Sequence, residues 1–198
     1  MRAVGAVILA AGESSRLGRP KQLIQFRGKS LLRGAFAAAH DAGCSPIVAV
    51  LGSDREGTMR ELEGTDAIFV ENENWRRGIG TSIRAGVETL LNRSADIETI
   101  LLLVCDQPFV DAEVIEQIVA RYEKTQKPIV ASAYAGTLGV PALFHRSVFA
   151  ELLVLGDESG AKPVILRDRD RVSEFSFAKG AIDIDTAADY EAVQGRGD

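Results

Sequence analysis

"VILAAGESSRLGRPKQ", residues 7–22, sets the interpretation of the whole chain, because it passes from an apolar strand to a polar loop within a few residues. Its apolar start is typical of a strand buried in a protein core. The remainder contains two glycines, two serines, two arginines and a lysine. It matches neither the phosphate-binding pattern Gly-x-x-x-x-Gly-Lys-Ser/Thr nor the dinucleotide pattern Gly-x-Gly-x-x-Gly. An anion-binding loop and an ordinary surface turn are both open from this stretch alone.

The loop has the chemistry of a phosphate site. Ala10, Ala11 and Gly12 have little or no side chain, so a ligand can approach the backbone, and successive N–H groups can bind an anion. Arg16 offers a planar pair of donors that suits phosphate oxygens, and Lys21 offers a compact positive charge. Phosphate is therefore the ligand that this set of donors predicts.

Outside this loop, short apolar runs alternate with amphipathic segments. Runs rich in Val, Ile and Leu predict strands over 4–10, 46–51, 67–70, 99–104 and 128–133. Helical spacing predicts helices over 30–42, 55–62, 81–91, 111–124, 146–153 and 186–193. This alternation predicts a mainly parallel sheet covered by helices on both faces, in a single α/β domain over residues 1–198. Ligands bind such sheets beyond the carboxyl ends of the strands.

Composition narrows the classes of function. The 198 residues carry a formal charge of −5 and a pI near 5.2, which argues against a nucleic-acid-binding protein. The apolar run near the N-terminus is too short for a membrane helix and lacks the form of a signal peptide. Cys44 and Cys105 are the only cysteines, so no disulfide framework is expected. We expect a cytoplasmic protein that binds neither nucleic acid nor membranes.

A second motif, "LLLVCDQPFV" over residues 101–110, places a carboxylate at the end of a buried strand. Asp106 emerges there, and a hard cation such as Mg²⁺ prefers one or two carboxylates together with phosphate oxygens. The alternative is that Asp106 only caps the following turn. Cys105 is expected to be a small buried residue and not a nucleophile, because no histidine lies near it in the sequence.

Near the C-terminus, "GAIDIDTAADY" over residues 180–190 supplies two more carboxylates. Asp183 and Asp185 point to the same side of an extended segment, so both can face one cation. If this segment returns beside Asp106, the two parts of the chain complete one metal site. The alternative is that both are ordinary acidic residues stabilised by the dipole of the helix that follows.

A third stretch, "NENWRRGIGTSIRAGV" over residues 72–87, predicts a loop that enters a helix. Gly78 permits a tight turn, and Thr81 or Ser82 is expected to cap the helix, whose N-terminus would face a nucleobase edge or a phosphate. Trp75 is expected to pack in the structure and not to stack on a base.

These motifs, in this order and spacing, resemble the MobA-like nucleotidyltransferases, and most of all the molybdenum-cofactor cytidylyltransferases among them. The resemblance covers essentially the whole chain and is carried by Leu9-Ala-Ala-Gly-x-Ser-x-Arg-Leu-Gly-x-x-Lys21, Asn74-x-x-x-Gly78-x-x-x-Ser82, Cys105-Asp-Gln-Pro108, Gly156-Asp-x-x-Gly-Ala161 and Asp183-Ile-Asp-Thr186.

The resemblance implies a three-layer, Rossmann-like nucleotidyltransferase fold that binds a nucleoside triphosphate and Mg²⁺, with Mn²⁺ as the alternative ion. It also implies that the terminal phosphate of an acceptor attacks the α-phosphorus and pyrophosphate leaves. No enzyme nucleophile is needed, so positioning and charge neutralisation would carry the catalysis.

The same resemblance implies roles for individual residues. The backbone from Leu9 through Ala10 and Ala11 to Gly12 should contact the base and ribose, and the motif with Gly78 and Ser82 should contribute to the nucleotide site. Arg16 should hold the β- and γ-phosphates, and Lys21 should lie near the α-phosphate and the acceptor phosphate. Asp106 should bind the metal, with Asp185 favoured over Asp183 as the second carboxylate.

Substrate choice follows from smaller features of the same resemblance. Ala11 stands where the guanylyl-transferring relatives carry a second glycine, which favours CTP over GTP. Val140 and Lys162 replace a histidine and an arginine that many cytidylyltransferases carry on the acceptor side. These two departures bear on the acceptor more than on the transferase reaction. The resemblance implies molybdopterin as the acceptor, passed on to an acceptor molybdoenzyme, with two alternatives open. One is transfer from GTP or to another phosphorylated acceptor, and the other is a non-catalytic cofactor-binding chaperone.

Overall fold

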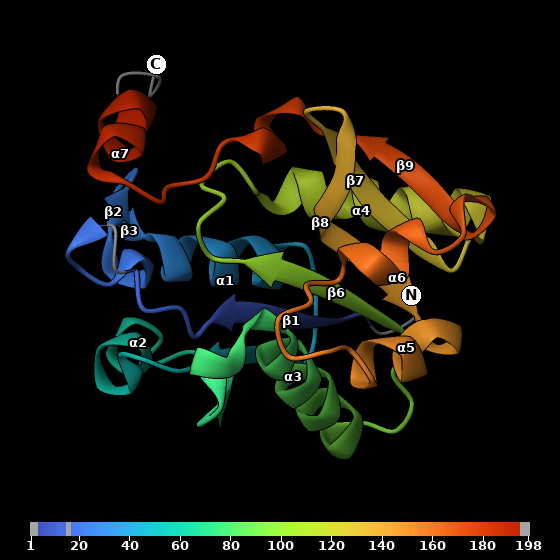
Figure 1. Cartoon of the computed structure of the whole chain (residues 1–198), viewed down its shortest axis with the longest axis horizontal. Helices are drawn as coiled ribbons and strands as arrows, with labels where there is room; N and C mark the ends of the chain where they lie inside the picture. Colours follow the sequence, from blue (N-terminus) through green and yellow to red (C-terminus); the bar gives the residue numbers. More distant parts are fainter. Residues whose placement is uncertain (1–3, 15–16, 195–198) are drawn as a thin grey trace.

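A seven-stranded sheet forms the centre of the computed structural model, which describes residues 4–14 and 17–194. The strand order is β5-β4-β1-β6-β8-β7-β9, and only β8 runs antiparallel to its neighbours (Figure 1). The strands are β1 (Val4–Ala10), β4 (Ile47–Leu51), β5 (Ile68–Glu71), β6 (Thr99–Val104), β7 (Ile129–Tyr134), β8 (Thr137–His145) and β9 (Val172–Ser176).

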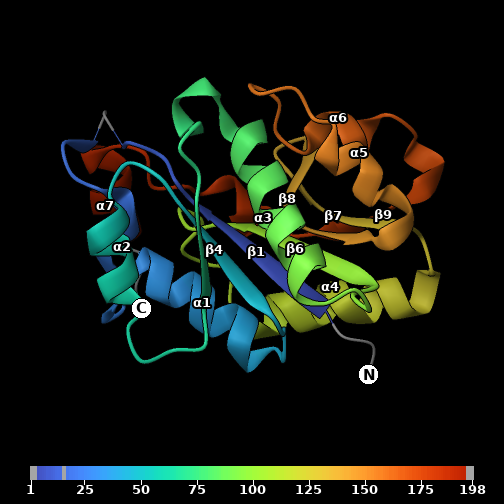
Figure 2. The ribbon, with the colours of Figure 1, turned by 90° about the horizontal axis from the view of Figure 1, so that it is seen from below.

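Helices cover both faces of this sheet (Figure 2). One face is covered by α1 (Leu31–Asp41) and α4 (Ala112–Thr125), and the other by α3 (Ile79–Arg93), α5 (Phe149–Leu153) and α6 (Lys162–Leu166). At the carboxyl edge lie α2 (Arg55–Glu61), α7 (Ala187–Gln194) and a hairpin of β2 (Gln25–Phe26) with β3 (Lys29–Ser30).

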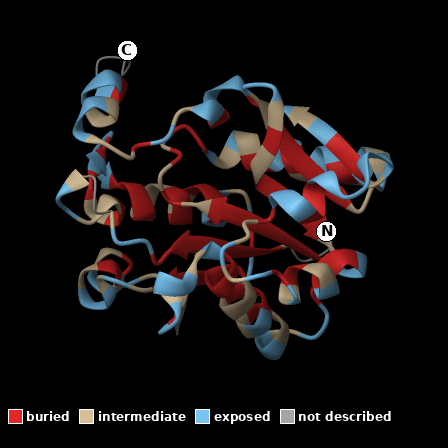
Figure 3. Ribbon diagram, in the orientation of Figure 1, coloured by how far each residue is buried: buried red, intermediate tan, exposed pale blue. Residues whose placement is uncertain are grey.

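Strand β1 shows why the apolar runs become buried strands. Its side chains alternate between two core clusters, so Ala6 and Ile8 pack on the α1 face while Val7 and Leu9 pack on the α3 face. A strand covered on both faces needs a continuous apolar sequence, as residues 4–10 have. Figure 3 shows the buried residues concentrated along the central strands and the helix faces that cover them.

The predicted parallel α/β architecture is confirmed, and so are the helix starts at Asp111 and Thr186. Asp111 Oδ1 accepts a hydrogen bond from Val114 N at 2.9 Å. Asp189 Oδ2 accepts from Thr186 N at 2.8 Å, and Asp189 N donates to Thr186 Oγ1 at 3.2 Å, which completes the capping box.

Two strands of the main sheet, β8 and β9, were not predicted, and neither was the β2–β3 hairpin. Strand β8 contains Gly139 and Pro141, which are unfavourable in strand interiors. The structure accommodates them at a register shift between β7 and β8, where Ser132 Oγ donates to the Pro141 carbonyl at 2.7 Å. The helix predicted over 146–153 consists of a 3-10 turn (Arg146–Val148) followed by α5.

The parallel strands β1, β4, β5 and β6 all end at the same edge of the sheet. The loops that follow them therefore meet there, as expected for a ligand site. Within the described residues, no helix is long and apolar enough to cross a lipid bilayer.

Candidate active site

The loop after β1 is held in shape by Gln22, a fully buried side chain that no motif in the sequence predicts to support the site. Its Nε2 donates to the carbonyl of Ala10 at 2.6 Å and to the carbonyl of Gly12 at 2.9 Å. Lys21 N donates to Ser14 Oγ at 2.9 Å across the same loop. A glutamine beside a charged lysine gave no sign in the sequence that it would be buried.

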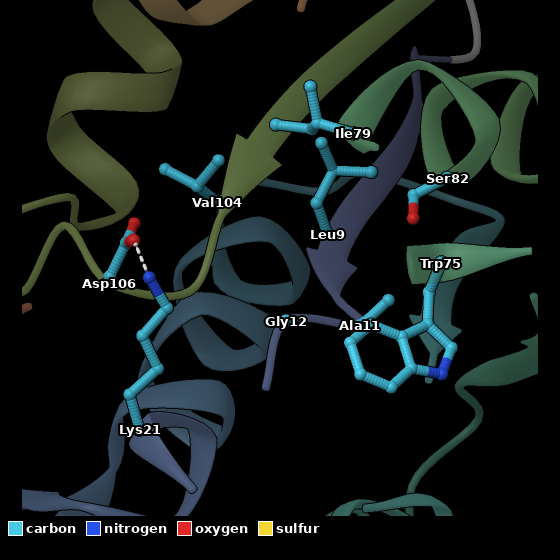
Figure 4. A pocket seen from close by; sticks show the side chains of 9 residues that line it. All are labelled: Leu9, Ala11, Gly12, Lys21, Trp75, Ile79, Ser82, Val104 and Asp106. Atoms are coloured by element: carbon cyan, nitrogen blue, oxygen red, sulfur yellow. Dashed lines mark hydrogen bonds and ion pairs between the residues drawn. The ribbon is translucent and has the colours of Figure 1, made fainter. Parts of the chain in front are cut away.

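Lys21 lies at the centre of a charged cluster. Its Nζ is paired with Asp106 Oδ2 (Figure 4) and lies 3.1 Å from Asp185 Oδ1. The backbone brings these carboxylates together, because Ile184 N donates to the Asp106 carbonyl at 3.0 Å. The C-terminal acidic segment therefore returns beside Asp106, as a shared metal site requires.

The carboxylates of this cluster shift the pKa values of their neighbours. Burial alone would lower the pKa of Lys21, but the charge and hydrogen bond of Asp106 outweigh it and raise that pKa, so the side chain stays protonated. The pKa of Asp183 is also raised, first by partial burial and then by the negative charges of Asp185 and Asp106. Asp183 thus lies within the electrostatic reach of the pair without sharing its lysine.

The donor set suits a hard divalent cation. Asp106 and Asp185 converge on one ammonium nitrogen, so their oxygens already surround a single position for a positive charge. Carboxylate oxygens are the protein ligands that Mg²⁺ prefers, and Mn²⁺ accepts them too. Across residues 4–14 and 17–194, no group of three His, Cys, Asp or Glu side chains could hold a metal. Mg²⁺ usually combines one or two carboxylates with water and phosphate oxygens, which the pair of Asp106 and Asp185 would allow.

A pocket opens beside this cluster, between the ends of β1 and β6 and the start of α3 (Figure 4). Its lining combines backbone of the β1 loop, apolar side chains, one hydroxyl and the Lys21–Asp106 pair. The lining residues are Leu9, Ala11, Gly12, Lys21, Trp75, Ile79, Ser82, Val104 and Asp106.

Two expectations for this region need correction or refinement. Neither Thr81 nor Ser82 caps the helix, because α3 begins at Ile79 with Gly78 as its N-cap, which places both hydroxyls in the first turn. Trp75 packs against the core as expected, but its ring also lines the pocket.

The glycines at the start of α3 allow a close approach to a second loop. A Cβ on Gly78, whose φ is +128°, would overlap the Asp157 carbonyl, and one on Gly80 would overlap the Gly156 carbonyl. Gly80 N donates to the Asp157 carbonyl at 2.8 Å. Gly78 thus shapes the helix start and is not among the residues that line the pocket.

Ion pairs of Asp157 stabilise the contact between the start of α3 and the loop that contains Gly156 and Asp157. Its carboxylate meets the Arg84 guanidinium at 2.5 Å and that of Arg77 at 2.6 Å. The hydrogen bond from Arg84 and the charges of both arginines hold the pKa of Asp157 below its usual range.

A second pocket adjoins the first, and the two share Leu9, Ile79 and Val104. Its walls are largely apolar, with Tyr134, Thr137 and Lys162 as polar members. Both sequence departures noted above, at Val140 and Lys162, line this second pocket.

Gln107 links the second pocket to the charged cluster. Its Nε2 donates to the Val140 carbonyl at 3.1 Å and to the Gly180 carbonyl at 2.7 Å. These bonds tie the residue next to Asp106 to strand β8 and to the segment that precedes Asp183.

The structure brings most of the predicted site residues together. Arg16 lies outside the described residues, and Ala10 contributes its carbonyl to Gln22 without lining the pocket. The pocket lining includes Leu9, Ala11, Gly12, Lys21, Ser82 and Asp106, and Asp185 joins them through Lys21.

Known proteins support the same interpretation. Rv0371c from Mycobacterium tuberculosis H37Rv has a crystal structure with 29% identity and a TM-score of 0.80, covering 98% of this chain and 99% of that one. A structure of Rv0371c in complex with manganese has 28% identity and a TM-score of 0.75, covering 96% and 97%.

Among characterised sequences, nicotine blue oxidoreductase from Paenarthrobacter nicotinovorans is 28% identical over 144 residues, 72% of this chain and 67% of that protein. Bifunctional protein GlmU from Syntrophotalea carbinolica is 32% identical over 128 residues, 64% of this chain but only 27% of that protein. Residues 6–172 match the family described as the MobA-like NTP transferase domain. The chain therefore belongs to the MobA-like nucleotidyltransferases, as its motifs predict.

Proposed function

We propose that the protein is a divalent-metal-dependent cytidylyltransferase that transfers CMP from CTP to the terminal phosphate of molybdopterin and releases pyrophosphate. The observation that carries this proposal is the position of Lys21, whose ammonium lies between Asp106 and Asp185 at the edge of a pocket lined by the β1 loop. A cation-binding carboxylate pair, a partly buried lysine and accessible loop backbone are the parts that nucleotidyl transfer needs.

The proposed reaction is one in-line displacement. An oxygen of the acceptor phosphate attacks the α-phosphorus of CTP, the bond from that phosphorus to the bridging oxygen of the β-phosphate breaks, and pyrophosphate leaves with the electron pair. No bond to the protein forms. In agreement, Cys105 is buried, and burial raises the pKa of its thiol to about 12, so the thiol is not a nucleophile at neutral pH.

In this proposal, Asp106 and Asp185 hold the divalent ion. When bound, the ion neutralises phosphate charge and orients the phosphate oxygens. Asp185 is favoured over Asp183 because it shares Lys21 with Asp106. The manganese complex of Rv0371c supports the use of a divalent ion in this family. Lys21 would neutralise charge on the reacting phosphates, and Arg16 would hold the β- and γ-phosphates.

The nucleotide would lie in the first pocket. Leu9, Ala11, Gly12 and Ser82 line this space, and the backbone of the first three and the hydroxyl of Ser82 would contact the base and ribose. CTP is favoured over GTP by the alanine at position 11. Gly78 would act by shaping the start of α3.

The acceptor would lie in the second pocket, which opens from the first. Its apolar walls suit the flat ring system of a pterin, and a sugar would need more polar partners than Tyr134, Thr137 and Lys162 provide. A sugar phosphate is the competing acceptor. We also propose a cytoplasmic location, in keeping with two buried, unpaired cysteines, and delivery of the product to a molybdoenzyme.

The test is to incubate the protein with each nucleoside triphosphate, with Mg²⁺ or Mn²⁺, and with molybdopterin or a hexose 1-phosphate, while pyrophosphate release is followed. We expect release with CTP and molybdopterin only. Release with a sugar phosphate would overturn the acceptor assignment. Absence of release with every combination, while cofactor binding persists, would favour a chaperone over a transferase.

A further inference from the structure

Asn72 is a buried residue directly after β5, next to the nucleotide pocket but not among the residues that line it. Its Nδ2 lies 2.8 Å from Thr81 Oγ1 and 2.9 Å from Ser82 Oγ, both in the first turn of α3. Its Oδ1 accepts a hydrogen bond from Asn74 N at 3.0 Å. Asn72 thus contacts Ser82, which lines the pocket, without lining the pocket itself.

The orientation of the Asn72 amide follows from the chemistry of its partners. A backbone N–H can only donate, so the side-chain atom that faces Asn74 N must be the oxygen. The nitrogen therefore faces the two hydroxyls, and each of its two hydrogens goes to one of them. Both hydroxyl oxygens must act as acceptors toward Asn72.

The hydrogen of each hydroxyl then has to go elsewhere. Thr81 donates its hydrogen to the Gly78 carbonyl at 2.7 Å. For Ser82, no acceptor is present among residues 4–14 and 17–194, and its oxygen is directed into the pocket (Figure 4). Ser82 therefore presents a hydrogen-bond donor to whatever occupies the pocket.

We infer that Asn72 is a positioning residue that fixes Ser82 as a donor, so that the pocket selects a nucleobase with an acceptor atom at this point. This inference rests on the proposed function. The N3 atom of cytosine is an acceptor of this kind, whereas N3 of uracil carries a hydrogen and would face the Ser82 hydrogen directly. O2 is an acceptor in both bases, so the selection between them depends on N3. The buried amide thus contributes to base selection without touching the base.

Asn72→Asp tests this inference, because a carboxylate has the same shape but only accepts hydrogen bonds. It would draw the Ser82 hydrogen inward and leave an oxygen lone pair facing the base. We expect the Kd for CTP, measured by calorimetry with Mn²⁺ present, to rise about tenfold, the size of one lost hydrogen bond. Ser82→Ala should raise it by a similar factor.

The decisive measurement combines the two changes. If Asn72 acts through Ser82, then Asn72→Asp should cause no further loss in the Ser82→Ala background. Thr81→Ala is the matched control, because it removes an equivalent hydrogen bond to Asn72 on the side away from the pocket, and it should leave the Kd for CTP unchanged. Thermal melting of each variant checks the fold.

If Asn72→Asp does not fold, Asn72→Ala can take its place in the test. Asn72→Ala frees the Ser82 hydroxyl to rotate and should weaken CTP binding about threefold, again only when Ser82 is present. CTP affinity at the wild-type level in Asn72→Asp, or the same loss with and without Ser82, would overturn the inference. Failure of the wild-type protein to bind any nucleoside triphosphate would instead overturn the proposed function itself.

Discussion

At the scale of single residues, the one positive charge of Lys21 has two roles. It pairs with the carboxylates of Asp106 and Asp185, and it neutralises phosphate charge in the proposed reaction. Lys21→Met keeps the length of the side chain and removes its charge. Turnover with CTP should fall about 100-fold, as when one preorganised charge is lost from a reaction centre. Binding of Mn²⁺ alone should stay as tight as in the wild type or become tighter, because the competing ammonium has left Asp106 and Asp185. Pyrophosphate release and a Mn²⁺ titration followed by electron paramagnetic resonance measure the two effects.

Asp106→Asn is the matched control for Lys21→Met, because it should lose both turnover and Mn²⁺ affinity. Equal loss of Mn²⁺ affinity in the two variants would mean that Lys21 supports the metal site and does not compete with it.

Asp183 should show its charge in the pH dependence of stability. Folding raises the pKa of the Asp183 carboxyl, so this group destabilises the folded state increasingly as the pH rises from the pKa of the unfolded state to that of the folded state, and fully above the latter. Asp183→Asn should therefore raise the free energy of unfolding at pH 7. The gain should be roughly 0.5 kcal/mol, because solvent screens much of the repulsion at this exposed side chain. It should vanish as the pH falls below about 4, where an unfolded aspartate becomes protonated.

Urea unfolding between pH 3 and pH 8 measures this difference. Asp96→Asn is the control, since Asp96 is exposed between α3 and β6, at the opposite edge of the sheet. The same pH-dependent gain in both variants would show that net charge, and not the carboxylate cluster, is responsible.

At the scale of elements, the start of α3 depends on the absence of a side chain at Gly80. A Cβ there would overlap the Gly156 carbonyl and approach the Ser159 carbonyl at 2.9 Å, so Gly80→Ala must push the helix away from this loop. We expect a loss of about 2 kcal/mol in the free energy of unfolding. Affinity for CTP should fall as well, because Ile79 and Ser82 would move with the first turn.

Gly34→Ala is the matched control for Gly80→Ala. Gly34 lies within α1 and has open space where its Cβ would be, so the same change should stabilise the protein by about 0.5 kcal/mol. Opposite signs in a urea titration would establish that packing against residues 156–159, and not helix propensity, decides the effect at Gly80.

The elements that the sequence predicted well are those whose two faces are both buried. The predicted bounds of β1 and β6 agree with the structure, because a continuous apolar run between polar residues defines such a strand. Strand β8 was missed because Gly139 and Pro141 interrupt its pattern, and only the register shift opposite β7 makes room for them. Local sequence carries no information about that partner.

At the scale of the whole molecule, the candidate site is assembled from distant parts of the chain, and this limits what the sequence could predict. Motifs nominated Lys21, Asp106 and Asp185 separately, but their meeting depends on the Ile184 to Asp106 hydrogen bond. Gln22 and Asn72 were not nominated, since each is an ordinary polar residue until the fold buries it against its partners. The residue types alone predicted which side chains could bind phosphate and metal. The residues that hold those side chains in place could be identified only from tertiary contacts.

The segment after residue 181 joins two sides of the site, although the family match ends at residue 172. Ile184 is fully buried in the core cluster of the α1 face, and Tyr190 Oη donates to the Gln25 carbonyl at 3.1 Å, which ties α7 to the β2–β3 hairpin. All seven strands of the main sheet precede this segment, so a chain ending at residue 181 should keep an α/β circular dichroism spectrum. Its free energy of unfolding should fall by about 2 kcal/mol or more, because the core loses the buried side chain of Ile184.

The truncated chain should also lose Mn²⁺ affinity and turnover, because Asp185 is removed with the segment. Asp185→Asn in the full chain separates the two effects: it should lose Mn²⁺ affinity while its melting temperature stays close to that of the wild type. If the truncated protein bound Mn²⁺ as tightly as the full chain, the second carboxylate would have to come from elsewhere. If Asp185→Asn melted as early as the truncated protein, the acidic pair with Lys21, and not the packing of Ile184 and α7, would be what holds this segment across the edge of the sheet.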